Sequence, residues 1–337
     1  HKSHHYGMVL SGAHVCYLDS YPLNEYSMYG AVPLSEIKRN LLMYKRSGQL
    51  GKVKMLLLTN CTFDGVVYNV ERVMEECLAI KPDLIFLWDE AWFAFAGFTP
   101  TYRRRTTMAT AKRLKARYRS EAYAAEYNVY QARIADLNDD DLLNERLMPD
   151  PALVRIRAYA TQSTHKSLTS LRQGSMIHVH DQDFNQKVNA PFTEAFMTHT
   201  STSPNYQILA SLDIGRRQVE LEGFEMVQKQ IELAMVIRER VASHPLLSRY
   251  FRFLSAKDMI PDEYRPSGIS NYFDPETGWK NNGMEEAWAQ DDFVIDPSRL
   301  TLYLGKTGID GDTFKTTYLM DKYGIQINKT SRNTVLF

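Results

Sequence analysis

The sequence predicts a doubly wound α/β domain followed by part of a smaller α/β domain. Residues 52–59 contain Val-Lys-Met-Leu-Leu-Leu and residues 84–88 read Leu-Ile-Phe-Leu-Trp, so both are nearly continuous apolar runs. Such runs are typical of strands covered on both faces, as in parallel sheets. An amphipathic helix is predicted between them at residues 70–80, ended by Lys81-Pro82. This alternation indicates a doubly wound sheet, in which ligands bind beyond the carboxyl ends of the strands.

Further elements are predicted around these runs. In chain order they are a strand at residues 14–19, a loop at 22–33, a helix at 35–45 capped by Ser35, strands at 154–160, 175–180 and 192–200, and a long helix at 205–242 with an interruption near Gly215 and Gly223. Together they predict a large domain over residues 1–244.

Residues 245–337 predict the beginning of a smaller C-terminal α/β domain. Its expected elements are a strand at 300–304, a helix at 314–322 that Gly324 ends, a strand at 325–328 and a last strand at 333–337. The chain opens with His-Lys-Ser-His-His without an initiator methionine, and it stops within the last strand. We therefore expect a segment of a longer polypeptide.

Residues 101–151 differ in composition and predict a helical insertion. No glycine occurs between Gly97 and Gly174, and alanine, leucine and charged residues dominate. A basic run that begins at Arg103 precedes acidic residues at 136–145, a pattern that nucleic-acid contact would also explain. The aromatic and glycine residues of a nucleic-acid-binding groove are missing, which favours a solvated helical face or a subunit contact.

The overall composition narrows the class of protein. The 337 residues carry 40 Lys and Arg against 40 Asp and Glu, so a formal net charge of zero gives no reason to expect nucleic acid or an anionic membrane as a partner. Cys16, Cys61 and Cys77 have neither paired nor metal-ligand spacing, so we predict no metal site and a reduced, cytoplasmic protein. No apolar run is long enough to span a bilayer.

Two ionisable residues that follow predicted strands are candidates for chemistry. Lys166 ends the sequence Ser163-Thr164-His165-Lys166 between two strands, where its amine could form a Schiff base with an aldehyde cofactor. Asp89 follows the apolar run at 84–88, where a carboxylate is costly to bury without a partner. Taken singly, the two residues are also consistent with a surface loop lysine and a solvated loop acid.

Residues 200–204, Thr-Ser-Thr-Ser-Pro, precede the long predicted helix. Hydroxyl side chains and a proline here are typical of a helix N-terminus. Free amide groups and the helix dipole at such a position also favour an anion, so the stretch is a candidate phosphate site. Both interpretations stay open from this stretch alone.

Six stretches, in this order, resemble one known family. They are His1-Lys2-Ser3, residues 58–65 (Leu-Thr-Asn-Cys-Thr-Phe-Asp-Gly), Asp89-Glu90-Ala91-Trp92, Ser163-Thr164-His165-Lys166, residues 175–179 (Ser-Met-Ile-His-Val) and residues 200–204. The chain resembles the bacterial Orn/Lys/Arg decarboxylase family, pyridoxal 5'-phosphate (PLP) enzymes of fold type I in the aspartate aminotransferase superfamily. The resemblance implies a large domain with a mostly parallel sheet of the seven-stranded type between helices. It also implies active sites at the subunit interface of a homodimer or higher homo-oligomer.

The resemblance implies roles for individual residues toward pyridoxal 5'-phosphate. Lys166 would hold the cofactor aldehyde, and Asp89 would pair with the pyridine nitrogen and keep the ring protonated. The other implied contacts are His1 and Ala91 on the two ring faces, Trp92 beside the ring, Ser163 at the phosphate, His165 at the phosphate or as a proton donor, and Thr202 and Ser203 at the phosphate in a neighbouring subunit. The family's main phosphate loop would precede His1, and its last region would follow Phe337.

The implied reaction is α-decarboxylation of a basic amino acid to the amine and carbon dioxide, in polyamine synthesis or acid resistance. Arginine, lysine and ornithine are all candidate substrates, and the glutamate of Asp-Glu-Ala-Trp slightly favours arginine. Two other functions stay open. One is another fold-type-I reaction such as transamination, and the other is a catalytically silent paralogue that acts as a regulatory or assembly subunit.

Overall fold

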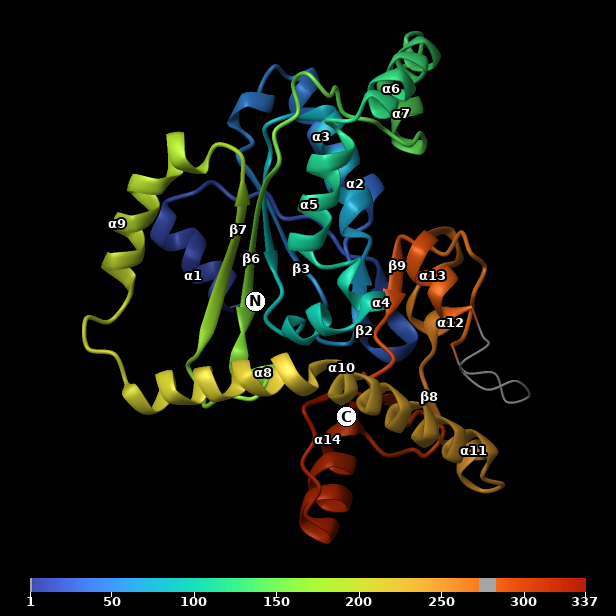
Figure 1. Cartoon of the computed structure of the whole chain (residues 1–337). Helices are drawn as coiled ribbons and strands as arrows, with labels where there is room; N and C mark the ends of the chain where they lie inside the picture. Colours follow the sequence, from blue (N-terminus) through green and yellow to red (C-terminus); the bar gives the residue numbers. More distant parts are fainter. Residues whose placement is uncertain (1, 273–282) are drawn as a thin grey trace.

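The computed structural model describes residues 2–272 and 283–337, and at its centre lies a four-stranded sheet in the order β3-β5-β6-β7 (Figure 1). The strands are β3 (Met55–Thr59), β5 (Ile85–Asp89), β6 (Arg157–Ser163) and β7 (Ser175–Asp181). β3, β5 and β6 run parallel, so the loops that follow them lie at one edge of the sheet. This confirms the α/β class, with four strands in this sheet among the described residues where the resemblance implied a seven-stranded type.

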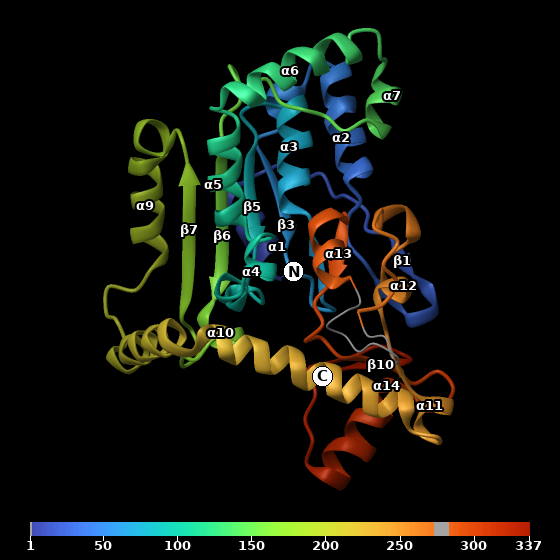
Figure 2. The ribbon, with the colours of Figure 1, turned by 45° about the vertical axis from the view of Figure 1, so that its right-hand side comes forward.

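Helices cover the two faces of this sheet unequally. α2 (Leu34–Arg46), α3 (Val70–Ile80) and α5 (Thr107–Arg117) pack on one face, whereas α1 (Lys2–Ser11) and α9 (Asn189–His199) lie along the other (Figures 1 and 2). Eight of the eleven residues of α3 are buried, and α1 and α9 bury none. The hydrophobic core therefore lies between the sheet and the α3 side.

α3 shows how local sequence sets an element. Its apolar residues recur at helical spacing, and the Asn69 side chain accepts a hydrogen bond from the amide of Arg72 at 3.1 Å. The helix ends at Ile80 because Lys81 precedes a proline and takes an extended backbone. The prediction for residues 70–80 is confirmed.

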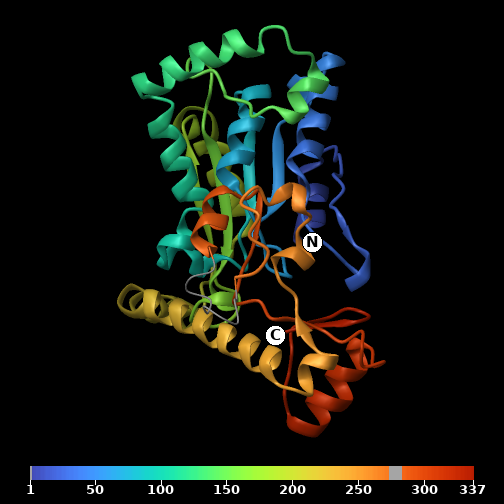
Figure 3. The ribbon, with the colours of Figure 1, turned by 90° about the vertical axis from the view of Figure 1, so that its right-hand side faces the viewer.

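A second sheet, with the strand order β11-β12-β10-β8, lies near the C-terminus. Its strands are β8 (Arg252–Phe253), β10 (Thr301–Tyr303), β11 (Lys329–Thr330) and β12 (Thr334–Leu336). The 38-residue helix α10 (Tyr206–Ser243) runs past the lower ends of β6 and β7 and reaches this second sheet (Figures 1 and 3). No helix of the described residues is both long and apolar enough to cross a membrane.

One further strand pair connects the two regions. β4 (Val66–Tyr68) follows the β3 loop and pairs antiparallel with β9 (Phe293–Ile295), and all six residues are buried. One hydrophobic core therefore extends from the first sheet to β9, and a separate cluster lies at the second sheet, made of Leu302, Leu304, Ile327 and Val335. This pairing places the turn after β9 close to the loop that follows β3.

Apart from α6, the remaining helices and strands are short. They are β1 (Pro22–Leu23), β2 (Met28–Tyr29), α4 (Pro100–Arg103), α6 (Glu121–Ile134), α7 (Asp139–Asn144), α8 (Thr164–Ser167), α11 (Leu247–Tyr250), α12 (Ala256–Met259), α13 (Met284–Gln290) and α14 (Gly311–Thr313), which continues as a π-helix at Phe314–Asp321. α6 and α7 form the end of the molecule opposite to α10 (Figure 3).

Three predicted strands are wrong. Residues 14–19 form no strand and find no pairing partner, and the strand expected at 325–328 begins only at Lys329. Residues 192–200 belong to α9 and the link that follows it. The four-residue spacing of Phe192 and Phe196, whose rings stack with centroids 6.5 Å apart, suits a helix better than a strand.

Two helix predictions also need correction, and the direction of one predicted strand becomes known. α2 begins at Leu34 after Pro33, so Ser35 does not cap it. α10 continues through Gly215 and Gly223 without interruption. These glycines allow close packing instead. An added Cβ would lie 1.9 Å from the carbonyl oxygen of Thr169 at position 215 and 2.9 Å from the Phe98 ring at position 223. The strand at 175–180 exists, but β7 runs antiparallel to β6.

Candidate active site

The carboxyl ends of β5 and β6 bring Asp89 and Lys166 to one edge of the sheet. Asp89 is the last residue of β5 and lies in register with Thr161 of β6. Lys166 lies in α8, which begins directly after β6 ends at Ser163. The topology therefore places the carboxylate and the amine where ligands bind in sheets of this kind.

Opposing effects set the ionisation of Asp89. Burial would raise the pKa of its carboxyl, but hydrogen bonds from His4 and from the amide of Ala91, together with the charge of Lys166, lower that pKa below its ordinary value. His4 Nε2 lies 2.8 Å from Oδ2, and the amide nitrogen of Ala91 lies 3.0 Å from Oδ1. Asp89 is therefore an ionised acceptor at neutral pH.

His4 is a site residue that the sequence reasoning missed. It lies in α1, which packs beside the first sheet, and contributes an imidazole N–H to Asp89 from a position 85 residues away in the chain. His1, the predicted ring-stacking residue, lies outside the described residues. The sequence carried a signal, because His4 lies only three residues after the His1 that the resemblance singled out.

A cavity of about 400 Å³ opens beside Lys166. Trp92 forms part of its wall, and the Lys166 ammonium nitrogen lies 5.2 Å from the centroid of the Trp92 ring. The cavity is lined by Trp92, Phe95, Phe98, Lys166, Ser167, Leu168, Thr169, Val219, Gly223, Met226, Val227, Gln230, Ser298, Arg299, Asn328 and Phe337. Of these described lining residues, Lys166 and Arg299 are charged.

The residues around Lys166 differ in how far they are already engaged. His165 Nδ1 lies 3.0 Å from the carbonyl oxygen of Gly174, so Nδ1 carries the proton and Nε2 is left to accept or deliver one. The hydroxyl oxygens of Ser167 and Thr169 are buried and make no hydrogen bond with the described part of the chain. Ser163 ends β6, opposite Ser175 of β7, and is half-buried.

The structure does not bring Thr202 and Ser203 to this cavity. Both side chains are exposed, and neither lines the cavity within the described residues. The cap of α10 is Asn205, whose side chain accepts from the amide of Ile208 at 3.1 Å, so the helix begins just after the predicted hydroxyl stretch. Thr202 and Ser203 therefore contribute no wall to this cavity among the described residues.

Glu90 follows Asp89 but faces the core. Its carboxylate accepts from the amide and hydroxyl of Thr107 at 2.8 and 2.6 Å, and from Nε2 of Gln162 at 2.8 Å. Burial raises the pKa of the Glu90 carboxyl, against the lowering effect of these hydrogen bonds. Glu90 is fully buried and does not line the cavity beside Lys166, so this carboxylate cannot read a substrate guanidinium there.

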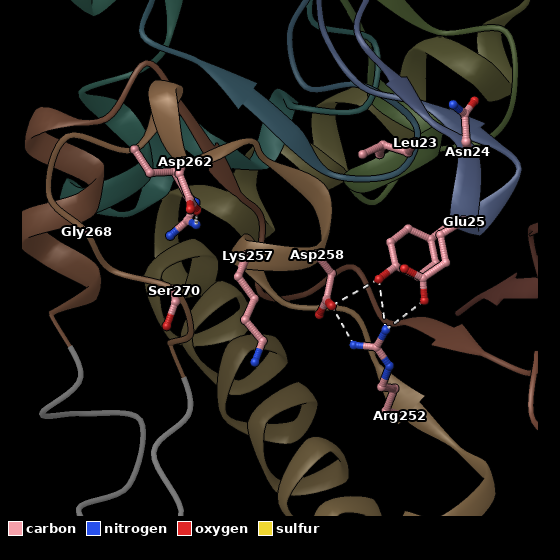
Figure 4. A pocket seen from close by; sticks show the side chains of 11 residues that line it. Leu23, Asn24, Glu25, Arg252, Lys257, Asp258, Asp262, Gly268 and Ser270 are labelled. Atoms are coloured by element: carbon pink, nitrogen blue, oxygen red, sulfur yellow. Dashed lines mark hydrogen bonds and ion pairs between the residues drawn. The ribbon is translucent and has the colours of Figure 1, made fainter.

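A larger cavity, of about 1030 Å³, lies between the turn at residues 23–26 and the segment from Arg252 to Ser270 (Figure 4). Arg252 pairs with Asp258 at 2.5 Å and with Glu25 at 3.4 Å. The pair with Glu25 joins the N-terminal turn to the C-terminal region, whereas the pair with Asp258 lies within that region. None of the residues that the sequence singled out lines this cavity.

Sequence comparison decides the family. A profile described as Orn/Lys/Arg decarboxylase, major domain, matches residues 1–118 and 150–337. The chain belongs to this family. Residues 119–149, which contain α6 and α7, fall outside the match.

Individual relatives agree with this assignment. Lysine decarboxylase LdcA of Pseudomonas aeruginosa is 32% identical over 250 residues, which are 72% of this chain and 28% of that protein. The biodegradative arginine decarboxylase of Escherichia coli is 28% identical over 100% of this chain and 43% of its own length. The solved structure of lysine decarboxylase A from Pseudomonas aeruginosa has a TM-score of 0.63 at 26% identity, over 100% of this chain and 41% of that one. The chain thus spans less than half the length of each of these relatives.

Proposed function

We propose that this chain is the cofactor-binding part of a pyridoxal 5'-phosphate-dependent enzyme that decarboxylates a basic amino acid. The observation that carries the proposal is the placement of the ionised Asp89 and the Lys166 amine at the ends of neighbouring parallel strands, with Lys166 lining a cavity of about 400 Å³. Membership of a carboxy-lyase family supports the reaction class.

The residues present fit this cofactor. Lys166 offers a primary amine at the cavity, and Asp89 offers an anionic partner for a protonated ring nitrogen. The hydroxyl groups of Ser167 and Thr169 line the cavity, make no hydrogen bond with the residues that the structure describes, and suit an anionic phosphate. When bound, the cofactor would supply an electron sink for the charge left by departing carbon dioxide.

The proposed roles follow from what each side chain already does. Asp89 stays charged and oriented because Ala91 and His4 donate to it, and a ring nitrogen would compete with His4 for the same carboxylate. His165 has Nε2 free of its Gly174 bond and is a candidate to deliver the proton that replaces carbon dioxide. Trp92 gives the site an aromatic wall next to Lys166.

Other assignments also belong to this proposal. Ala91 and His1 would contact the two faces of the cofactor ring, and Ser163 would contact the phosphate. Thr202 and Ser203 are exposed on this chain, and we propose that they reach the phosphate of a neighbouring subunit in a homodimer or larger assembly. A cytoplasmic enzyme of polyamine synthesis or acid resistance is the corresponding proposal for cellular role.

The substrate class is a basic amino acid, and the described residues do not select among arginine, lysine and ornithine. The charged side chains that line the cavity, Lys166 and Arg299, are both positive and would repel the far cation of the substrate. Glu90 is engaged in the core. Recognition of the substrate's side-chain cation therefore requires residues other than those that line this cavity.

The test is a carbon dioxide assay of the purified protein, supplied with pyridoxal 5'-phosphate and each of the three amino acids. Lys166→Ala should abolish carbon dioxide release and the visible absorbance of the bound cofactor, whereas Lys229→Ala, at an exposed lysine on α10, should change neither. Keto-acid product without carbon dioxide would indicate transamination. A wild-type protein that stays colourless would indicate a silent paralogue.

A further inference from the structure

Arg299 and Lys166 both lie against the Trp92 side chain. The Arg299 guanidinium carbon lies 5.0 Å from the centroid of the Trp92 ring, and Nη2 donates to the Trp92 carbonyl oxygen at 3.3 Å. The Lys166 ammonium nitrogen lies 5.2 Å from the same ring centroid. Two cationic side chains, 133 residues apart in sequence, therefore contact one indole ring.

A buried acid lies next to the Arg299 guanidinium. Asp296 is fully buried, and its Oδ2 lies 3.6 Å from Nε of Arg299. Its Oδ1 accepts from the Tyr102 hydroxyl at 2.7 Å and from the amide and hydroxyl of Ser298 at 2.9 and 2.7 Å. The carboxylate that faces Arg299 is thus itself held by three hydrogen bonds.

Gly65 leaves room for the stem of Arg299. The backbone of Gly65 has φ +97°, and a Cβ at this position would lie 2.8 Å from both Cβ and Cγ of Arg299. A residue with a side chain at position 65 would be strained and would also displace the arginine. The glycine of the segment at 58–65 therefore has a physical role in seating Arg299.

We propose that Arg299 is a positioning residue, which fixes the Trp92 indole against the Lys166 amine and so sets the rate at which that amine reacts with an aldehyde. A planar guanidinium can bind a carbonyl oxygen and lie over a ring at the same time, which a lysine ammonium cannot match. The aldehyde in this inference rests on the proposed function, whereas the contact with Trp92 does not.

A nearby cation offers a matched control. Lys329 lies 5.9 Å from the ring centroid of Phe63, and the Phe63 and Trp92 rings meet edge to face at 5.2 Å. Lys329 pairs with Asp64 at 2.5 Å, so its charge is compensated locally. Lys329→Met therefore removes a cation from the same aromatic cluster without releasing Trp92.

The first experiment measures how well acrylamide quenches the fluorescence of Trp92 in the purified protein without cofactor. The Trp92 signal is the difference between each protein and its counterpart that also carries Trp92→Phe. We expect Arg299→Met to raise the quenching constant of this signal, Arg299→Lys to raise it less, and Lys329→Met to leave it unchanged. An unchanged constant in Arg299→Met would overturn the proposal, whatever the enzyme's reaction.

The second experiment measures the rate at which pyridoxal 5'-phosphate adds to Lys166, a condensation that forms one C=N bond and releases one water. Arg299→Met should slow it by on the order of tenfold to a hundredfold, the effect of a small displacement at a reacting group. Gly65→Ala, which displaces Arg299 without replacing it, should slow the same step. Thermal unfolding of each variant identifies loss of fold.

A double-mutant cycle separates positioning from a direct effect. If Arg299 acts through Trp92, Arg299→Met should have no further effect on this rate once Trp92→Phe is present. Additive effects of the two substitutions would overturn the proposal. If wild-type Lys166 does not react at all, the proposed function fails, and the quenching experiment still decides the Arg299–Trp92 contact.

Discussion

Asp89 and Glu90 are consecutive acids at the end of β5. Their surroundings shift the pKa values of the two carboxyls in opposite directions. Burial acts to raise the pKa of both carboxyls. For Glu90 burial prevails, whereas at Asp89 the contacts of His4, Ala91 and Lys166 reverse it. Asp89 faces the edge where Lys166 lies, and Glu90 faces Thr107 and Gln162 in the core.

The comparison shows that, of two neighbouring carboxylates, one can serve ligand binding while the other serves stability. Asp89 has a basic partner at the edge of the sheet and suits a cationic ligand atom. Glu90 joins α5 to β6 through Thr107 and Gln162, and Gln162 Oε1 accepts from His178 of β7 at 3.1 Å. Changes at the first acid should therefore affect chemistry, and changes at the second should affect folding.

The largest expected effect is that of Asp89→Asn on decarboxylation. The amide keeps the shape but removes the charge, so kcat/KM should fall on the order of a hundredfold to a thousandfold, as when one electrostatic contact of an active site is lost. Steady-state carbon dioxide release measures it, with Glu90→Gln as the matched control that keeps cofactor binding. Equal losses in the two variants would remove the division of roles.

Glu90→Ala should lower the free energy of unfolding by about 1–3 kcal/mol, because it leaves buried donors of Thr107 and Gln162 without an acceptor. Urea unfolding of the purified protein gives the value. Glu90→Gln, which keeps one acceptor oxygen, should lose less. An alanine variant as stable as the wild type would show that the network contributes nothing.

The pH dependence of stability should have opposite signs at the two acids. Because the folded-state pKa of Glu90 is raised, its stabilising contribution is present below the ordinary carboxyl pKa of ~4 and is lost as pH rises through the folded value. The contribution of Asp89, whose pKa is lowered, is present above ~4 and is lost as pH falls through the folded value.

Melting temperatures of wild type, Asp89→Asn and Glu90→Gln between about pH 3 and pH 7 measure these contributions. The advantage of wild type over Glu90→Gln should shrink as pH rises, and its advantage over Asp89→Asn should shrink as pH falls. Parallel curves for the two variants would contradict the environments described for the two acids.

The smallest expected effect is that of Arg46→Met, at the C-terminal end of α2. Arg46 pairs with Asp139 at 2.7 Å and Asp140 at 3.1 Å of α7, and its side chain is largely exposed. Exposed ion pairs are screened by water and contribute little. The melting temperature should stay within experimental error of wild type, which gives the baseline for the core acid. A fall as large as that of Glu90→Ala would show that the contact between α2 and α7 contributes to the stability of the whole chain.

The sequence was sufficient for the elements whose signals are local. The apolar runs of β3 and β5, the capped and proline-ended α3, and the long helix α10 all appear close to the predicted bounds. The placement of Asp89 at the end of a strand and of Lys166 just after another also followed from the sequence. The predictions at residues 14–19 and 192–200 failed, because a strand needs a partner and a short aromatic segment also fits a helix.

Lys166 and Asp89 could be named from the sequence alone, since each belongs to a motif that follows a strand. Their shared edge, the antiparallel direction of β7 and the opposite environments of Asp89 and Glu90 depended on pairing between distant segments. His4 and Arg299 reach the site from 85 residues before Asp89 and 133 residues after Lys166, respectively. Side-chain periodicity reports which face of an element is apolar. Only the packing of whole elements decides which charges meet there.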